Sequence, residues 1–98
     1  MAQFGVYEIK GRRLVLDCQH DALSDLDSRV VAPLSPLGDP IIGFARLNPE
    51  VEVSGRRYKV AMQLLRAINR RELGRLVAQL DDDDFAIKSA IDLLISGF

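Results

Sequence analysis

The clearest feature of the sequence is a pair of alternating runs on either side of a Ser-Gly pair at residues 54–55. Before this pair, Val51 and Val53 alternate with glutamates. After it, apolar residues recur at every second position from Tyr58 to Leu64. Alternation with period two is typical of half-buried strands, and a short polar pair containing glycine is typical of the turn between them. The pattern predicts an antiparallel β-hairpin and restricts the chain to folds that contain one.

A second hairpin is predicted at the N-terminus. Residues 4–9 are rich in β-branched and aromatic side chains, residues 10–13 supply a turn, and Leu14, Leu16 and Cys18 then alternate with other residues. Residues 20–28 have no clear period and predict a loop. A short apolar strand follows at residues 29–32, and Pro33 is expected to confine it to an edge or an end of the sheet.

Residues 61–80 support two interpretations. Their apolar residues fit helical spacing, so the local pattern alone favours a helix. Gly74 argues against a helix that continues through it, because glycine costs about 1 kcal/mol relative to alanine there. The residues alone leave this segment open.

The C-terminal segment predicts an amphipathic helix. Its apolar residues recur at steps of three and four, and they are Ile87, Ala90, Ile91, Leu94, Ile95 and Phe98. The four aspartates at 81–84 are expected to cap its positive end, and Gly97 is expected to end it. A calcium or magnesium loop is the less favoured reading of the aspartates, because the glycine and distal glutamate of an EF-hand are missing.

Length and composition indicate one domain, spanning residues 1–98. No apolar run approaches the roughly 20 residues that a membrane helix needs, and the first residues lack the blocks of a signal peptide, so we expect a cytoplasmic protein with no membrane partner. Cys18 is the only cysteine. It is expected to be a small buried apolar residue, and it excludes an internal disulfide or a cysteine-based zinc cage.

Charge is unevenly distributed along the chain. Residues 54–76 carry 7 basic and 1 acidic side chains, a net charge of +6, while the segments before and after them sum to -3 and -4. The basic segment is suited to an acidic partner segment or a phosphate backbone. The alternative, that these charges are simply solvated on exposed strand faces, stays open at this point.

No pattern of residues indicates an active site. His20 is the only histidine, and the sequence contains no nucleophile elbow, zinc-protease motif or phosphate-binding glycine loop. His20 beside Asp21 is a poor acid-base pair, because neighbours in sequence seldom face each other. We therefore expect no catalytic residues, no cofactor and no metal, and a protein that binds other proteins instead.

Three blocks of sequence together resemble the CcdB family of bacterial toxins. They are Gln3-Phe4-x-Val6-Tyr7, Val30-Val31-Ala32-Pro33-Leu34 and the tail from Ala90 to Phe98. The resemblance implies a fold that is mainly β with a C-terminal α-helix: an SH3-like small β-barrel of the CcdB/MazF type, with an added small sheet, assembled as a homodimer. It also implies that residues 61–68 are extended and that a short strand lies near Val77.

The resemblance implies a function as well. Such proteins are the toxins of type II toxin-antitoxin systems and act as topoisomerase poisons: they bind the A subunit of DNA gyrase and trap it on cleaved DNA. The residues expected to bind the target protein are Ala22, Leu23, Asp92, Ile95, Ser96, Gly97 and Phe98. The family's tail is Trp-Gly-Ile, whereas this chain has Ser96, Gly97 and Phe98. Three outcomes stay open: weak gyrase binding, Phe98 as the anchor, or a different target.

The same resemblance implies an antitoxin that neutralises the toxin through an acidic, disordered segment. Arg66, Arg70 and Arg71 are the residues expected to bind it, through contacts that weaken with salt. Nucleic acid is expected only indirectly, through the antitoxin. Two other functions remain as alternatives: an endoribonuclease with the same fold, or a non-toxic co-regulator that acts with its antitoxin in transcription regulation.

Overall fold

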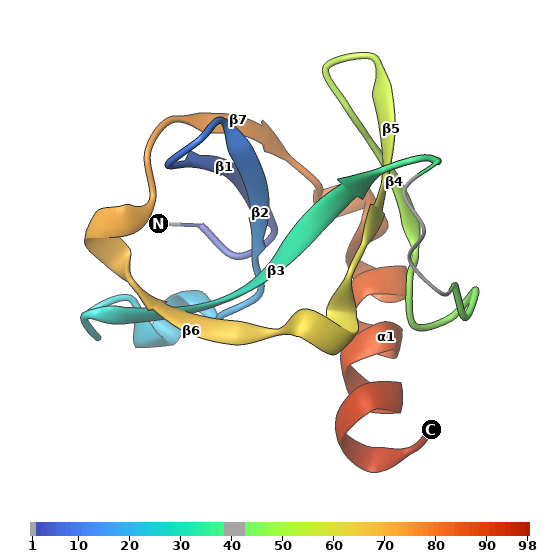
Figure 1. Cartoon of the computed structure of the whole chain (residues 1–98). Helices are drawn as coiled ribbons and strands as arrows, with labels where there is room; N and C mark the ends of the chain where they lie inside the picture. Colours follow the sequence, from blue (N-terminus) through green and yellow to red (C-terminus); the bar gives the residue numbers. More distant parts are fainter. Residues whose placement is uncertain (1, 39–42) are drawn as a thin grey trace.

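The computed structural model describes residues 2–38 and 43–98. It is mainly β with one C-terminal α-helix, as expected (Figure 1). The strands are β1 (Gly5–Ile9), β2 (Arg13–Asp17), β3 (Ser28–Pro36), β4 (Glu50–Val53), β5 (Arg56–Val60), β6 (Arg66–Asn69) and β7 (Leu76–Gln79). Short 3-10 turns lie at η1 (Asp21–Leu23), η2 (Met62–Leu64), η3 (Arg70–Glu72) and η4 (Asp81–Asp83), and the helix α1 spans Asp84–Ser96.

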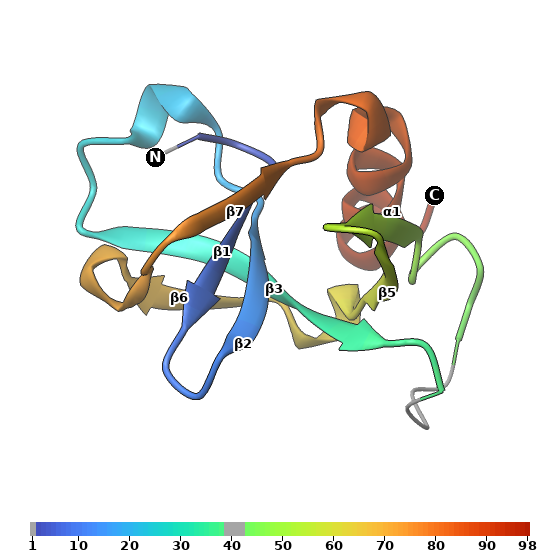
Figure 2. The same ribbon diagram turned by 90° about the horizontal axis from the view of Figure 1, so that it is seen from above.

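The long strand β3 organises the sheet. The hydrogen-bonded order is β4-β5-β3-β2-β1-β7, and β6 also pairs with β3. Every strand pair in this arrangement is antiparallel. Because β3 pairs with β2 on one side and with both β6 and β5 on the other, the sheet curls into a half-barrel from which the β4–β5 hairpin projects (Figures 1 and 2).

The expectation that Pro33 would place its strand at an edge was wrong. β3 runs through Pro33 as a central strand, with Pro33 opposite Val15 of β2. The other side of β3 changes partner at this point: pairing with β6 ends at Val31, and pairing with β5 begins at Leu34. The Pro33 carbonyl accepts the Ala61 N–H at 2.9 Å. Proline has no N–H to donate, but Pro33 lies between the part of β3 that pairs with β6 and the part that pairs with β5. No hydrogen bond of either ladder is therefore lost.

Both predicted hairpins are present. In the second, Val51 pairs with Tyr58 across the β4–β5 ladder. Its turn residues Ser54 and Gly55 both have positive φ, at 52° and 81°. Two consecutive left-handed residues define the turn that matches the twist of antiparallel strands. The first hairpin joins β1 and β2 and has the same left-handed backbone at Gly11 and Arg12.

The segment 61–80 is not a helix, so the local periodicity was misleading there. It contains η2, β6, η3 and β7, and β7 lies where a short strand near Val77 was expected. The expectation of an extended chain from 61 to 68 holds for β6 but not for η2. Gly74 has a packing role: its N–H donates to the Glu8 carbonyl at 2.8 Å, and a Cβ at this position would also lie 2.8 Å from that oxygen. Pairing with β1 and β3 thus overrides the helical spacing.

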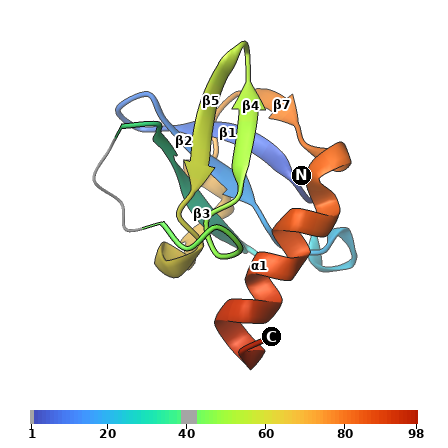
Figure 3. The same cartoon turned by 90° about the vertical axis from the view of Figure 1, so that its right-hand side faces the viewer.

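The helix α1 begins and ends near the predicted positions (Figure 3). Gly97 adopts the left-handed conformation at φ 84°, and its N–H bonds to the Leu93 carbonyl at 3.0 Å, so it ends the helix as expected. The expected side-chain cap is not formed. Asp83 precedes the helix without a capping hydrogen bond, because the aspartates form the turn η4 instead. Their charges still lie at the positive end of the helix dipole.

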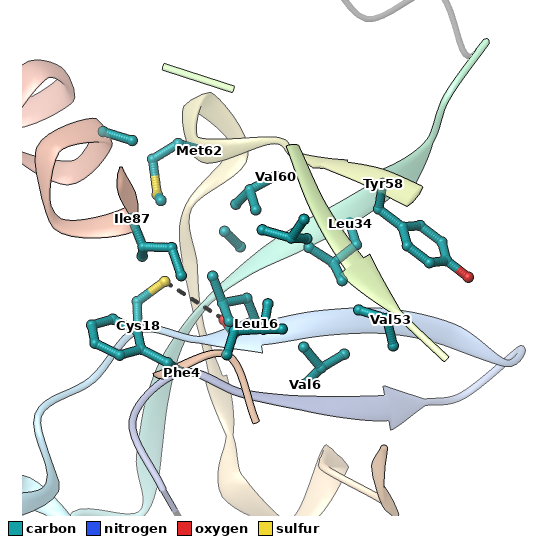
Figure 4. Packing of buried hydrophobic residues seen from close by; sticks show 14 residues of the cluster. Phe4, Val6, Leu16, Cys18, Leu34, Val53, Tyr58, Val60, Met62 and Ile87 are labelled. Atoms are coloured by element: carbon teal, nitrogen blue, oxygen red, sulfur yellow. Dashed lines mark hydrogen bonds between the residues drawn. The ribbon is translucent and has the colours of Figure 1, made fainter. Parts of the chain in front are cut away.

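The main hydrophobic core lies between the curled sheet and α1 (Figure 4). Met62 and Ile87 meet there from η2 and the helix, next to Leu16 and Val60 of the strands. Cys18 is buried in the same cluster, as predicted. Burial, assisted by the Asp17 carboxylate, raises the pKa of the Cys18 thiol to about 12. The thiol is therefore protonated and acts as a small apolar side chain.

A buried ion pair lies on the other face of the sheet, next to a smaller cluster around Val15 and Val31. Arg29 donates through Nη2 and Nε to Oδ2 of Asp17, at 2.6 and 3.1 Å, and neither side chain is exposed to solvent. Asp17 also accepts the Gln19 N–H, and Arg29 also donates to the Gln19 carbonyl. Sequence analysis gave no sign of this pair.

This geometry predicts a large loss of stability when one partner is removed. Arg29→Met should lower the free energy of unfolding by about 3 kcal/mol or more, because it leaves the Asp17 carboxylate buried without its counter-charge. Urea denaturation measures this. Arg57→Met is the matched control: its ion pair with Glu50 is about half exposed and should contribute less than about 1 kcal/mol. Equal losses in the two variants would contradict the argument.

Candidate functional site

The apolar stripe of α1 divides into a buried half and an exposed half. Ile87 and Ala90 are fully buried in the core. In contrast, Ile95 is 69% exposed and Phe98 is 82% exposed. The stripe that the sequence predicted is therefore continuous, but the sheet covers only its first half. The second half presents unpaired apolar surface at the end of the helix, where the family resemblance placed target-binding residues.

The other tail residues lie on this same end of the helix. Asp92 and Ser96 are exposed, and Gly97 turns the chain out of the helix before Phe98. Ser96 faces solvent, and it lies outside the apolar stripe. Phe85, in the first turn of α1, is also 82% exposed and was not singled out from the sequence. Phe85 lies more than two helical turns from Ser96, so it is separate from the tail.

Ala22 and Leu23 do not join this surface within one chain. Both lie in the exposed turn η1, and Leu23 is 50% exposed. Nδ1 of His20 caps this turn by accepting the Ala22 N–H at 2.9 Å. In Figures 1 and 2 the light-blue turn η1 and the C-terminal end of α1 lie on opposite sides of the molecule. A surface containing both sets of residues would therefore have to span the chain or use two copies of it.

The three arginines predicted to bind the antitoxin lie in different surroundings. Arg66 begins β6 and lines a cavity described below. Arg70 lies 3.8 Å from the Asp27 carboxylate and donates to the Ser24 carbonyl. Arg71 donates to the side chain of Asn69. Each of the three thus has its own set of contacts, and their role in binding the antitoxin stays a prediction.

One cavity, next to Arg66, has a volume of about 610 Å³. It lies between the first hairpin, the end of β3, β5 and the start of β6, and α1 does not line it. Four arginines line it: Arg12, Arg13, Arg56 and Arg66. Sequence analysis noted a basic segment, but it did not single out the first three, because they come from two hairpin turns more than 40 positions apart.

His20 and Asp21, and also the carboxylate of Glu72, have contacts other than those of an acid-base pair. His20 and Asp21 do not pair: His20 caps η1, and Oδ1 of Asp21 accepts the Gln3 N–H at 2.7 Å. Glu72, the one carboxylate of the basic segment, accepts the Asn69 N–H at 3.0 Å and completes a capping box at η3. Within residues 2–38 and 43–98, no three acidic, histidine or cysteine side chains gather where they could hold a metal ion.

Comparison with known proteins decides the family. The family model described as "CcdB protein" matches residues 3–97. The chain belongs to the CcdB family. A search of curated proteins found no significant match.

Two solved structures support the fold. One is titled "Crystal structure of Mtb toxin": it is 21% identical with a TM-score of 0.76, and the match covers 92% of this chain and 99% of that one. The other, Mycobacterium tuberculosis toxin MazF-mt6, is 20% identical with a TM-score of 0.71, and the match covers 92% of both chains. These likenesses establish a shared toxin fold.

The family match and the two toxin structures together support a toxin of a toxin-antitoxin system, with an antitoxin as its partner. In the described part of the chain, the one α-helix is too short to cross a membrane.

Proposed function

We propose that this protein is a toxin that acts by binding a target protein through the C-terminal end of α1, and that the target is the A subunit of DNA gyrase. The observation that carries the proposal is the exposed apolar end of the helix, where Ile95 and Phe98 extend beyond the part that packs on the sheet. Exposed apolar groups beside polar ones are typical of protein-binding surfaces. Members of the CcdB family use this same end of the helix for gyrase. The proposed site of action is the cytoplasm.

The energetics of this surface depend on its aromatic content. Burying a side chain of the size of Phe98 or Ile95 in an interface contributes about 1.5 to 3 kcal/mol. The family has tryptophan where this chain has Ser96, and a central tryptophan typically contributes about 2 kcal/mol or more. Phe98 and Ile95 thus offer part of the binding energy of the family tail. We propose a gyrase affinity below that of tryptophan-bearing relatives, with Phe98 as the main anchor.

This proposal predicts that Ser96→Trp strengthens binding to the gyrase A subunit by at least about tenfold, which corresponds to about 1.4 kcal/mol. An exposed tryptophan at this position can bury aromatic surface and stack on a target arginine. Because Ser96 faces solvent, the fold should lose less than about 0.5 kcal/mol. Titration calorimetry with the gyrase A subunit and with the antitoxin measures both affinities, and antitoxin affinity should hardly change.

Ala86→Trp is the matched control for this experiment. Ala86 is also exposed on α1, but it lies at the first turn, far from the tail. This variant adds the same aromatic surface and should leave gyrase affinity unchanged. Equal effects of the two substitutions, or nanomolar gyrase binding by the wild-type protein, would show that the missing tryptophan does not limit target binding.

We also propose that the protein is not an enzyme. Two observations support this: Glu72 is engaged in a capping box, and His20 caps a turn away from the arginine-lined cavity. Neither side chain is positioned to act as a general base on an RNA phosphate in that cavity. Purified protein should therefore leave RNA uncut in a gel assay. Site-specific cleavage that is lost in His20→Ala would refute this part of the proposal.

The proposed assembly is a homodimer. A chain of 10.9 kDa has a small core, and several of its large apolar side chains are more than half exposed, including Phe44, Phe85 and Phe98. Association would cover part of this surface. Light scattering at micromolar concentration should give a mass near twice that of the chain. A mass near that of a single chain would exclude the dimer.

A further inference from the structure

The cavity lined by Arg12, Arg13, Arg56 and Arg66 is here called the arginine cavity. Arg57, Arg70 and Arg75 each lie within 4.0 Å of a carboxylate. The four arginines of the cavity have no ion-pair partner among the described residues, and no carboxylate lines the cavity. Four guanidinium groups around one cavity without counter-charge produce a strong local positive potential.

The wall of the arginine cavity is mainly apolar. It contains aliphatic and proline side chains from β2, β3 and η2, including Leu14, Leu34, Pro36 and Leu64. Leu64 is 57% exposed, so its side chain is available to a ligand. A ligand that fits both features carries negative charge for the arginines and apolar groups for the wall.

Among residues 2–38 and 43–98, Tyr58 is the one aromatic residue that lines the cavity, and it is only 9% exposed. The Arg56 guanidinium lies 5.8 Å from the centre of its ring. This contact places the cation over the aromatic face and orients Arg56 at the cavity. Single-stranded nucleic acids depend on exposed aromatic faces for base stacking, and the arginine cavity offers none. Its apolar wall instead suits aliphatic side chains.

We propose that the arginine cavity docks an acidic peptide segment that carries aliphatic side chains. Glutamate or aspartate carboxylates pair with the four arginines, and leucine-type side chains of the segment contact Leu64 and the prolines of β3. Arginine is well suited to this, because its planar fork binds a carboxylate through two hydrogen bonds. The source of the segment rests on the proposed function: in a toxin of a toxin-antitoxin system, the antitoxin supplies it.

The proposal changes which arginines recognise the acidic segment. Of the three expected from the sequence, only Arg66 lines the cavity, whereas Arg70 already pairs with Asp27. In this proposal Arg12, Arg13 and Arg56 bind the segment together with Arg66. Arg70 and Arg71 do not take part. Binding should weaken with salt, because four exposed cations attract the segment from a distance.

The test uses ¹⁵N-labelled protein and three fluorescent probes of about 12 units each. They are a peptide of glutamate and leucine, the same peptide with glutamine in place of glutamate, and a single-stranded oligouridylate. At low salt the acidic peptide should shift the amide signals of Leu14, Ser35, Arg56 and Leu64, which lie around the cavity. The glutamine peptide should bind at least about tenfold more weakly, as the loss of several charge-assisted contacts requires.

Two variants locate the site. Arg13→Gln combined with Arg56→Gln should weaken binding of the acidic peptide at least about tenfold, and signal dispersion in the spectrum confirms that the variant is folded. Arg57→Gln is the matched control, because Arg57 is adjacent in β5 but pairs with Glu50 outside the cavity. The affinity of the Arg57→Gln variant for the acidic peptide should stay within about twofold of the wild-type affinity. Leu64→Asn should also weaken binding, since it removes apolar contact surface.

Three results would overturn the proposal: equal binding of the glutamate and glutamine peptides, signal shifts away from the cavity, or tighter binding of oligouridylate than of the acidic peptide at the cavity. The last would assign the cavity to nucleic acid. The helix α1 does not line the cavity, so the two experiments are independent. If the acidic peptide does not bind the cavity, the gyrase experiment with Ser96→Trp is unaffected. If Ser96→Trp does not strengthen gyrase binding, the peptide result is unaffected.

Discussion

The buried pair of Asp17 and Arg29 is the contact on which the central part of the sheet depends. It joins the end of β2 to the start of β3, the strand that also holds β5 and β6. The chain between them forms η1, and Gln19 ties this loop to the strands by accepting the Val30 N–H and donating to the Leu23 carbonyl. Nη1 of Arg29 has no hydrogen-bond partner among the described residues. Loss of the counter-charge would leave a buried charge unpaired, which is strongly destabilising, so the pair opposes a shift of register at this point.

Sequence analysis predicted the local elements well and the long-range pairing poorly. Both hairpins and the helix α1 follow from period-two and period-3.6 patterns with suitable turn residues. The segment 61–80 could not be resolved this way, because its apolar spacing fits a helix while its structure is determined by pairing with β1 and β3. Pro33 illustrates the same limit of prediction from local patterns. Whether a proline is tolerated in a central strand depends on where the neighbouring strands begin and end. Asp17 and Arg29 are 12 positions apart, and no local pattern connects them.

The candidate site was predictable only where it is continuous in sequence. The tail from Asp92 to Phe98 lies on one helix end, so a resemblance in sequence was sufficient to propose it as a binding surface, and the structure adds that Ile95 and Phe98 are exposed. The arginine cavity is discontinuous. Its basic residues come from the turn of one hairpin, the start of another strand and a third strand beyond η2. Only the curl of the sheet brings them together, so they could be found only from the structure.

The two proposed surfaces lie on different elements, and this has a consequence for neutralisation. A short acidic segment in the arginine cavity contacts β2, β3, β5 and η2, but not the end of α1. It therefore cannot block a target bound at Ile95 and Phe98 by covering those residues. An antitoxin that docks in the cavity must either extend further to reach the helix end, or lower target affinity through a change in the fold that both ligands influence. With the first arrangement, the length of the antitoxin segment determines neutralisation, and truncating it would separate binding from inhibition.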